Sequence, residues 1–222
     1  MHLVDYYYDI HSEFGEDGII YFFVKSLNID RPKTFLNICE NFKHKNMFLF
    51  SIVQLGFKSC VPLSHNQGKV ECTPYGILSV LKDISSVYIM CVNTRGVDYW
   101  LLDKYIRNCK PEQKPVIIFC KINPNIPFDK QFTVPYTPPS NRLTYYTQTY
   151  YGASLGAIYT RLKKDYTFVG TTRNATFGVF VSNAYVTGNV LYDTFLFPNV
   201  SHSQKQNYWQ QLPKNRMWIT VK

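Results

Sequence analysis

Polar side chains follow four apolar runs that are typical of buried strands, and they are the first candidates for chemistry. One run, 87–91, precedes Asn93, Thr94 and Arg95 and then the turn residue Gly96. The other three runs end in Asn37-Ile38-Cys39-Glu40, Leu63-Ser64-His65 and Lys121-Ile122-Asn123-Pro124. Ligands of α/β proteins bind beyond the carboxyl ends of the parallel strands, so these positions predict a ligand site. The strand before Gly96 ends without a carboxylate to act as an acid or base.

An acidic stretch near the start of the chain is a second candidate. Glu13, Glu16 and Asp17 lie close to His11, at the beginning of a segment with helical spacing. These carboxylates could border the ligand site. We favour the alternative, in which they complement the positive end of the helix dipole.

Four tyrosines surround a loop that follows Arg142. They form the pairs Tyr145-Tyr146 and Tyr150-Tyr151. Such rings could stack on bases or sugars, or they could anchor the loop by packing against the protein. The residue types alone leave both alternatives open.

Two further combinations could hold or attack a ligand. Ser154 precedes a predicted helix, where free backbone N–H groups can seat an anion. With Arg95 and Lys121 at neighbouring strand ends, the pocket is expected to prefer an anionic ligand. Cys39 and His65 could form a nucleophile and base pair if the fold brings them within hydrogen-bond reach.

Alternating apolar segments must position these residues. Apolar residues at near-helical spacing, together with cap residues such as Thr73 and Pro74, predict helices. These helices span 16–27, 45–56, 73–84, 98–109 and 151–166, and Gly56 takes the C-terminal glycine position of the second. Short apolar runs predict strands at 34–40, 58–64, 86–92, 114–122, 167–172 and 176–182.

This order predicts an α/β fold: a Rossmann-like, doubly wound and mostly parallel sheet with an antiparallel strand pair towards its C-terminal end. A chain of 222 residues suits one domain, with its core at about 12–181. The extension at 183–222 mixes Asn, Gln, Ser and aromatic residues and has no assignable pattern.

Four segments in a fixed order carry a resemblance to a known family. They are SEFGEDGI at 12–19, GVDYW at 96–100, INPNIPFD at 122–129 and YYGASLGAIYTRLKKDYTFVGT at 150–171. Together, over roughly 12–181, they resemble the FkbM-like methyltransferases, class I enzymes that use S-adenosylmethionine. The resemblance implies the class I methyltransferase version of the Rossmann-like fold.

The resemblance also shows which cofactor-binding residues are replaced. Where the family has Glu-x-Gly after the first strand, this chain has Asn37 and Cys39, with Glu40 as a shifted acid. The family's ribose-binding acid is replaced at Ser64 and His65. The resemblance also places Glu16 and Asp17 near the cofactor and the Tyr150, Tyr151 and Ser154 segment near the acceptor.

The later strand ends have changed charge as well. Asn93 and Arg95 replace two acids of the family, and Lys121 replaces a glutamate, whereas Asp98 and Asn123 are retained. A cation within about 4–6 Å disfavours a positively charged sulfonium ligand. We therefore expect an inactive pseudo-methyltransferase reused as a binding or interaction module, without a cofactor. The alternative is an active S-adenosylmethionine-dependent O-methyltransferase with a divergent pocket.

Composition limits the partners. The formal net charge is +9, with dense basic clusters at 43–45, 161–164 and 214–216. This charge favours an unknown protein or anionic partner, nucleic acid among them. Six cysteines without a Cys-x-x-Cys pair argue against a structural zinc site, and no other metal is predicted.

Localisation follows from what the sequence lacks. No signal peptide is apparent, and no apolar run approaches the ~20 residues of a membrane span. Unpaired thiols are typical of the cytoplasm. Loss of motifs on a retained fold suits a viral or otherwise fast-evolving genome.

Overall fold

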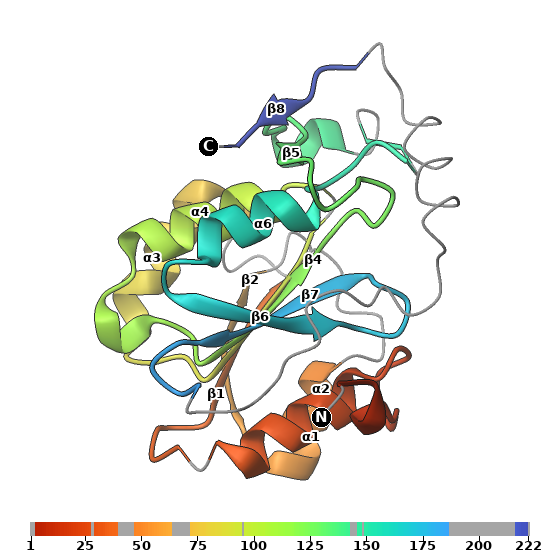
Figure 1. Cartoon of the computed structure of the whole chain (residues 1–222). Coiled ribbons are helices and arrows are strands. Elements are labelled where there is room, and N and C mark those ends of the chain that lie inside the picture. The colour runs from red at the N-terminus through yellow and green to blue at the C-terminus, as the bar shows by residue number, and fades with distance from the viewer. Residues whose placement is uncertain are drawn as a thin grey trace.

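The protein, seen here in a computed structural model, is an α/β fold built on a six-stranded sheet of order β2-β1-β3-β4-β7-β6 (Figure 1). The structure describes residues 3–27, 29–39, 47–63, 72–94, 96–142, 146–147, 149–186 and 216–221. In sheet order the strands are β2 (Lys58–Leu63), β1 (Thr34–Cys39), β3 (Ile89–Asn93), β4 (Ile117–Lys121), β7 (Phe177–Ser182) and β6 (Tyr166–Thr171).

The sheet is parallel from β2 to β4, and β7 runs antiparallel to both of its neighbours. The prediction of a mostly parallel sheet with an antiparallel pair is therefore confirmed. The arrangement is compatible with a Rossmann-like fold.

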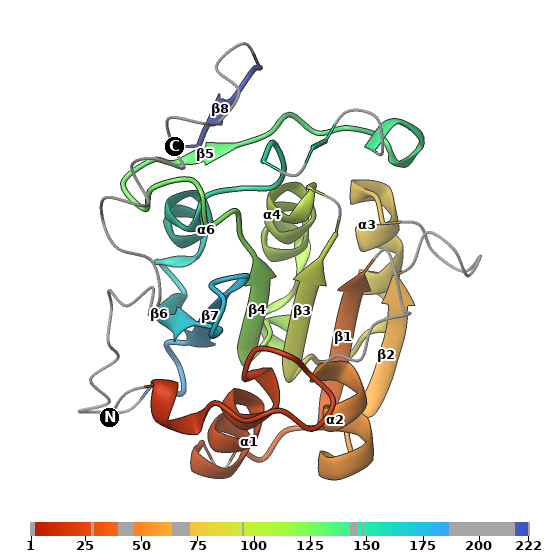
Figure 2. The same cartoon turned by 90° about the vertical axis from the view of Figure 1, so that its right-hand side faces the viewer.

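Helices cover both faces of the sheet, which explains why its strands read as continuous apolar runs. The helices are α1 (Glu16–Ser26), α2 (Met47–Leu55), α3 (Pro74–Asp83), α4 (Asp98–Asn108) and α6 (Leu155–Leu162). Figures 1 and 2 show α1 and α2 on one face and α3, α4 and α6 on the other. Short 3-10 helices lie at η1 (Leu3–Tyr6), η2 (Pro111–Gln113) and η3 (Pro139–Asn141).

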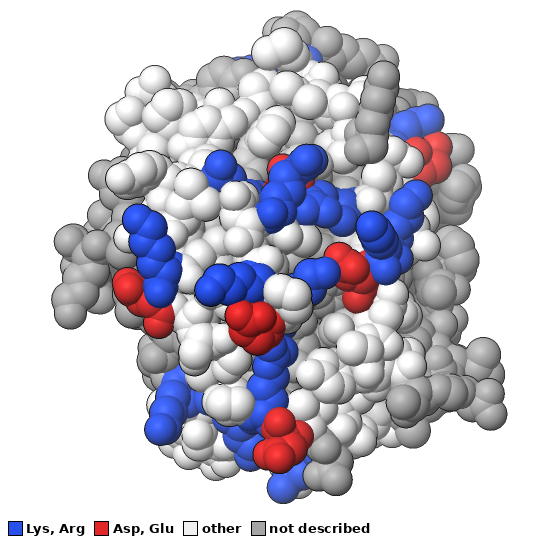
Figure 3. All heavy atoms as spheres, turned by 90° about the vertical axis from the view of Figure 1, so that its left-hand side faces the viewer, with Lys and Arg blue, Asp and Glu red and all other residues white. Residues whose placement is uncertain are grey.

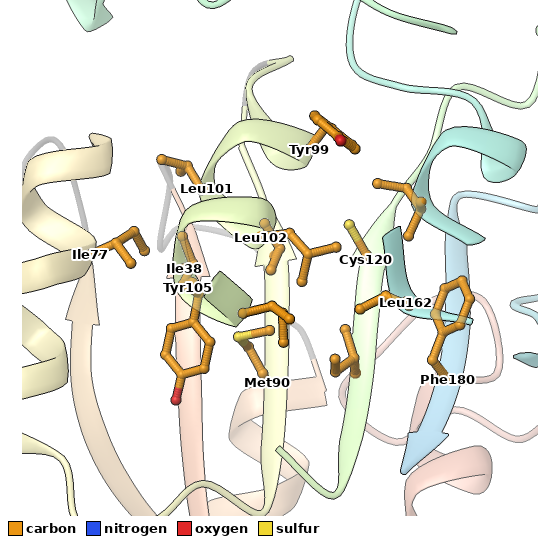
Figure 4. Close-up of a cluster of buried hydrophobic side chains, with 14 of the residues drawn as sticks. Ile38, Ile77, Met90, Tyr99, Leu101, Leu102, Tyr105, Cys120, Leu162 and Phe180 are labelled. Atoms are coloured by element: carbon orange, nitrogen blue, oxygen red, sulfur yellow. The ribbon is translucent and has the colours of Figure 1, made fainter. Parts of the chain in front are cut away.

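Each face has its own hydrophobic core, because alternate strand residues point to opposite sides. Ile38 and Met90 pack with α3, α4 and α6, as the close-up in Figure 4 shows. Phe35, three positions before Ile38, and Ile89, one position before Met90, point to the other side and pack with α1 and α2. The register of β1 against β3 keeps these two sets apart.

The predicted helix signals are confirmed at two positions. The Thr73 hydroxyl accepts a hydrogen bond from the Gly76 N–H, and Pro74 is the first residue of α3. Gly56 follows α2 with a φ of 67°, the left-handed conformation that commonly ends a helix.

The helix predicted at 151–166 is shorter than the sequence pattern indicated. Gly152 has a φ of 61°, and Ala153 bridges to Thr133, so α6 begins only after Ser154. At its other end α6 stops at Leu162, and Tyr166 already belongs to β6.

The C-terminal extension contributes a short strand. β8 (Ile219–Thr220) pairs antiparallel with β5 (Phe132–Thr133) in a separate two-stranded sheet. Residues 187–215 of the extension lie outside the described ranges.

Candidate functional site

The carboxyl ends of three neighbouring strands form the floor of the candidate site. Cys39 of β1 is in register with Asn93 of β3, and Val92 is in register with Cys120, which places Lys121 next in the row. Figure 2 shows β1, β3 and β4 side by side. This row, called here the tip row, consists of Cys39, Asn93 and Lys121 and thus carries a thiol, an amide and an ammonium group.

A buried carboxylate lies next to the tip row. Asp98 begins α4 and is fully buried, and its Oδ1 accepts a hydrogen bond from the Thr94 N–H at 2.6 Å. Its Oδ2 has no hydrogen-bond partner among the residues that the structure describes. A Cβ built on Gly152 would be in ordinary contact with this oxygen, at 3.7 Å, so the loop backbone lies beside the carboxylate.

Burial and charge act in opposite directions on Asp98. Burial raises the pKa of its carboxyl to about 6, and the nearby Lys121 ammonium opposes the rise. Burial, with a smaller contribution from Asp98, raises the pKa of Tyr151 to about 12. The Lys121 Nζ lies 5.8 Å from the centre of the Tyr151 ring. Asp98, Lys121 and Tyr151 therefore form one electrostatically coupled cluster.

Asn123 fixes the loop that carries Tyr151. It is fully buried, and its Nδ2 donates to the carbonyls of Thr149 and Tyr151, both at 3.0 Å. Its Oδ1 accepts from the Asn125 N–H at 3.1 Å. All three bonds go to backbone groups, so this side chain holds the loop over the end of β4.

Tyr150 and Ser154 are also bonded to the protein itself. The Tyr150 hydroxyl donates to the Met217 carbonyl at 2.5 Å, and its buried ring contacts Trp218 edge-on. The Ser154 Oγ donates to the Lys130 carbonyl and accepts from the N–H groups of Phe132 and Ala157. Both residues are buried and anchor the segments around them.

The acidic stretch folds its own loop against α1. The Asp17 Oδ2 accepts three backbone N–H groups, from residues 10, 11 and 12, at 2.6–2.9 Å. The Glu16 Oε2 accepts the Phe14 N–H at 2.9 Å, and burial raises the pKa of this carboxyl. Both carboxylates are buried at the first turn of α1, where they complement the helix dipole.

The start of α1 is electrostatically linked to the tip row through the Cys91 thiol. Burial raises the pKa of Cys91 well above its ordinary value, and Cys39, Glu16 and Asp98 add to the rise. Asn37 is buried in register with Cys91, and its Nδ2 has no hydrogen-bond partner in the described ranges. The positive charge of Lys121 has the opposite effect and lowers the pKa of the Cys91 thiol.

Five of the sequence-predicted positions lie outside the described residues: Glu40, Ser64, His65, Arg95 and Tyr145. The pairing of Cys39 with His65 therefore stays a prediction. Within the described part of the chain, no group of three or more His, Cys, Asp or Glu could hold a metal ion. No described helix has both the length and the apolar character needed to cross a membrane.

Sequence reasoning missed the role of Arg142, which was expected beside a stacking platform. Its guanidinium is buried and donates to the carbonyls of Thr137 and Cys72, and burial lowers its pKa to about 10. Arg142 thus connects the loop to Cys72, two residues before α3 begins. Nothing local in the sequence marks a contact across that separation.

The fold and the strand ends define an α/β protein with polar residues where Rossmann-like folds bind ligands. No family model, curated protein or solved structure matches the chain.

Proposed function

We propose that the chain is a methyltransferase-like domain that has lost its cofactor chemistry and serves as a binding or interaction module. The observation that carries the proposal is the tip row of Cys39, Asn93 and Lys121. In the family that the chain resembles, a glycine stands at the position of Cys39 and acids stand at the positions of Asn93 and Lys121. The Asn93 amide and the Lys121 ammonium group lack the negative charge of those acids, and the ammonium group has no acceptor at all.

Charge supports the same proposal. S-adenosylmethionine carries a positive sulfonium group and a positive amino group, and Lys121 adds a like charge at the strand end. Like charges a few ångströms apart disfavour each other strongly in a partly buried site. The described residues therefore fit this cofactor poorly.

The retained polar residues are used for structure. Asn123 has its side-chain bonds on the loop backbone, and Asp98 holds the turn between β3 and α4 through the Thr94 N–H. The fold thus accounts for the Asn123 side chain and for one of the two Asp98 oxygens. The resemblance to methyltransferases and the loss of their chemistry are thus compatible.

Calorimetric titration tests the proposal directly. We expect no binding heat with S-adenosylmethionine or S-adenosylhomocysteine up to about 1 mM, the range of very weak affinity. The variant Lys121→Glu removes the repulsive charge. Lys130→Glu, at a partly exposed lysine that pairs with Asp129, is the matched control. Micromolar binding by the unaltered chain would contradict the proposal.

One observation favours a second candidate, an active O-methyltransferase. Asp98 has a carboxyl with a pKa near 6, close to the operating range of a general base, and one oxygen without a described hydrogen-bond partner. This candidate requires cofactor binding in the calorimetric test. It further requires that Asp98→Asn abolish transfer of a labelled methyl group to a hydroxyl acceptor while leaving cofactor affinity unchanged.

A further inference from the structure

Basic side chains gather at the end of the molecule opposite the tip row. Figure 3 shows Lys and Arg, with fewer Asp and Glu among them, on the side of the molecule that lies at the left of Figure 1, where α3, α4 and α6 are found. Hydrogen bonds, ion pairs and helix ends join the segments around 31, 107–114 and 161–165. The name basic face is used here for Arg31, Arg107, Lys110, Lys114, Arg161, Lys163 and Lys164.

Only part of this charge is neutralised. Arg107 and Arg161 share one carboxylate, Asp103, at 2.8 and 2.5 Å, and Lys114 pairs with Asp165 at 3.0 Å. Positive charge is favourable where helices end, but two arginines on one aspartate leave an excess.

Three lysines of the basic face remain available. Lys110, Lys163 and Lys164 are exposed and form no ion pair within the described part of the chain. They can therefore contact an anion without first giving up an internal partner.

An aromatic pocket opens beside these lysines. It lies between α6 and β6, has a volume of about 350 Å³ and includes Lys163 at its rim. The remaining lining residues are Phe128, Tyr159, Tyr166, Thr167, Phe168 and Asn183. The volume falls within the range of pockets that hold small organic groups.

The pocket offers both ring faces and polar groups. The Tyr159 side chain is 36% exposed, and its ring centre lies 5.7 Å from that of Phe128. Thr167 donates to the Asn183 side-chain oxygen at 2.8 Å, which places hydroxyl and amide groups at the wall. Aromatic faces beside cations are the features with which proteins bind unpaired bases and their phosphates.

We propose that this pocket and the basic face bind single-stranded nucleic acid. One base stacks against Tyr159 in the pocket, and the flanking phosphates contact Lys163 and Lys164. A duplex presents its phosphates but keeps its bases stacked, so it gains only the electrostatic part. The formal net charge of +9 adds a general attraction for any nucleic acid.

The position of β6 at the sheet edge suggests another occupant, an extended protein segment that pairs with the strand. The cations and aromatic rings favour nucleic acid, because backbone pairing requires neither. The inference does not depend on the fate of the cofactor site, which lies at the other end of the sheet. Calorimetry with S-adenosylmethionine tests that site alone.

Fluorescence anisotropy with a labelled 16-nucleotide single-stranded RNA of mixed sequence, and with its duplex, tests the proposal. At about 50 mM salt we expect the single strand to bind at least tenfold more tightly than the duplex, as expected for base stacking. Tyr159→Ala should weaken single-strand binding about tenfold and leave duplex binding unchanged. Lys163→Ala should weaken both and lower the salt slope by about 0.7 for the single strand.

Matched controls separate the site from general charge and from folding defects. Tyr75→Ala removes an 82% exposed tyrosine from α3, and Lys25→Ala removes an exposed lysine from α1. Affinities of Tyr159→Ala and Lys163→Ala equal to those of the controls would overturn the proposal. Equal affinities for duplex and single strand would overturn it too. Displacement of the 16-mer by uridine monophosphate at equal molar concentration would also overturn it, because the pocket would then bind a free nucleotide.

Discussion

Both ends of the sheet carry polar residues, but those at one end are buried and bonded and those at the other are exposed. At the carboxyl end, Asp98 and Asn123 are fully buried and bonded to backbone groups. At the opposite end, Lys163 and Lys164 are exposed and unpaired within the described ranges, beside the 36% exposed ring of Tyr159. The contrast teaches that a residue type marks a functional site only when its bonding capacity is not already used by the fold.

This difference should appear in the effects of substitution. A buried side chain that bonds to the backbone contributes to the free energy of unfolding, because its removal leaves buried groups unsatisfied. An exposed side chain without partners contributes almost nothing to stability. Variants at the carboxyl end should therefore unfold more easily, and variants at the basic face should fold normally and lose binding.

Asn123→Ala is expected to have the largest effect. It removes three side-chain hydrogen bonds from a fully buried position and leaves two carbonyls and one N–H without their partner. We expect the free energy of unfolding to fall by about 3–4 kcal/mol. Urea unfolding followed by tryptophan fluorescence measures it. Asn108→Ala, at an exposed helix position with one side-chain bond, should change stability by less than about 0.5 kcal/mol; equal effects of the two substitutions would break the comparison.

Asp98→Asn tests the buried carboxylate through pH. Because burial raises the pKa of Asp98 from 3.8 to about 6, the folded chain keeps a proton that the unfolded chain releases between these pH values. The free energy of unfolding should therefore fall by about 2 kcal/mol as the pH rises from about 4 to 6, and by about 3 kcal/mol over the whole titration. Asparagine does not titrate, so this fall should be absent from the variant.

Unfolding curves at several pH values, compared between the unaltered chain and the variant, isolate this contribution. Asparagine keeps an oxygen for the Thr94 N–H, so the variant should fold. Asp129→Asn is the control, since Asp129 is 69% exposed. If Asp98→Asn and the unaltered chain show the same pH dependence, the carboxylate is not buried as described.

Lys121→Met should have a smaller effect. The Lys121 ammonium lowers the pKa of Asp98, so its removal should raise that pKa and extend the fall in stability to higher pH. Loss of the contact with the Tyr151 ring should cost less than about 1 kcal/mol. Unfolding curves at the same pH values measure both changes. If the free energy of unfolding instead fell at lower pH than in the unaltered chain, Lys121 would not lower the pKa of Asp98.

Most of the fold could be predicted because its signals are local. The apolar runs before Cys39, Asn93 and Lys121 became β1, β3 and β4, since both faces of these strands are covered. Thr73 and Pro74 marked the start of α3 correctly. The predicted start of α6, at 151, was wrong. The true start depends on the bridge between Ala153 and Thr133, a contact between separate loops.

The site was predictable only in part, for the same reason. Parallel strands end at one edge, so the meeting of Cys39, Asn93 and Lys121 followed from their order. The approach of Asp98 to Tyr151 depends on the loop that Asn123 holds, and no local pattern encodes it. The pocket beside the basic face was missed altogether, since its walls come from the β4–β5 loop, α6, β6 and the residue after β7.

The smallest effects on stability are expected at the basic face. Lys163→Ala should leave the free energy of unfolding within about 0.5 kcal/mol, and Tyr159→Ala should lower it by no more than about 1 kcal/mol, through partial loss of packing on Phe128. The same urea series measures both. A fall of about 3 kcal/mol in the free energy of unfolding for either variant would show that the pocket residues stabilise the fold. The polar residues at both ends of the sheet would then have a structural role. Unchanged stability with weaker binding of single-stranded RNA would give the comparison its sharpest form, because a single substitution would then separate binding from folding.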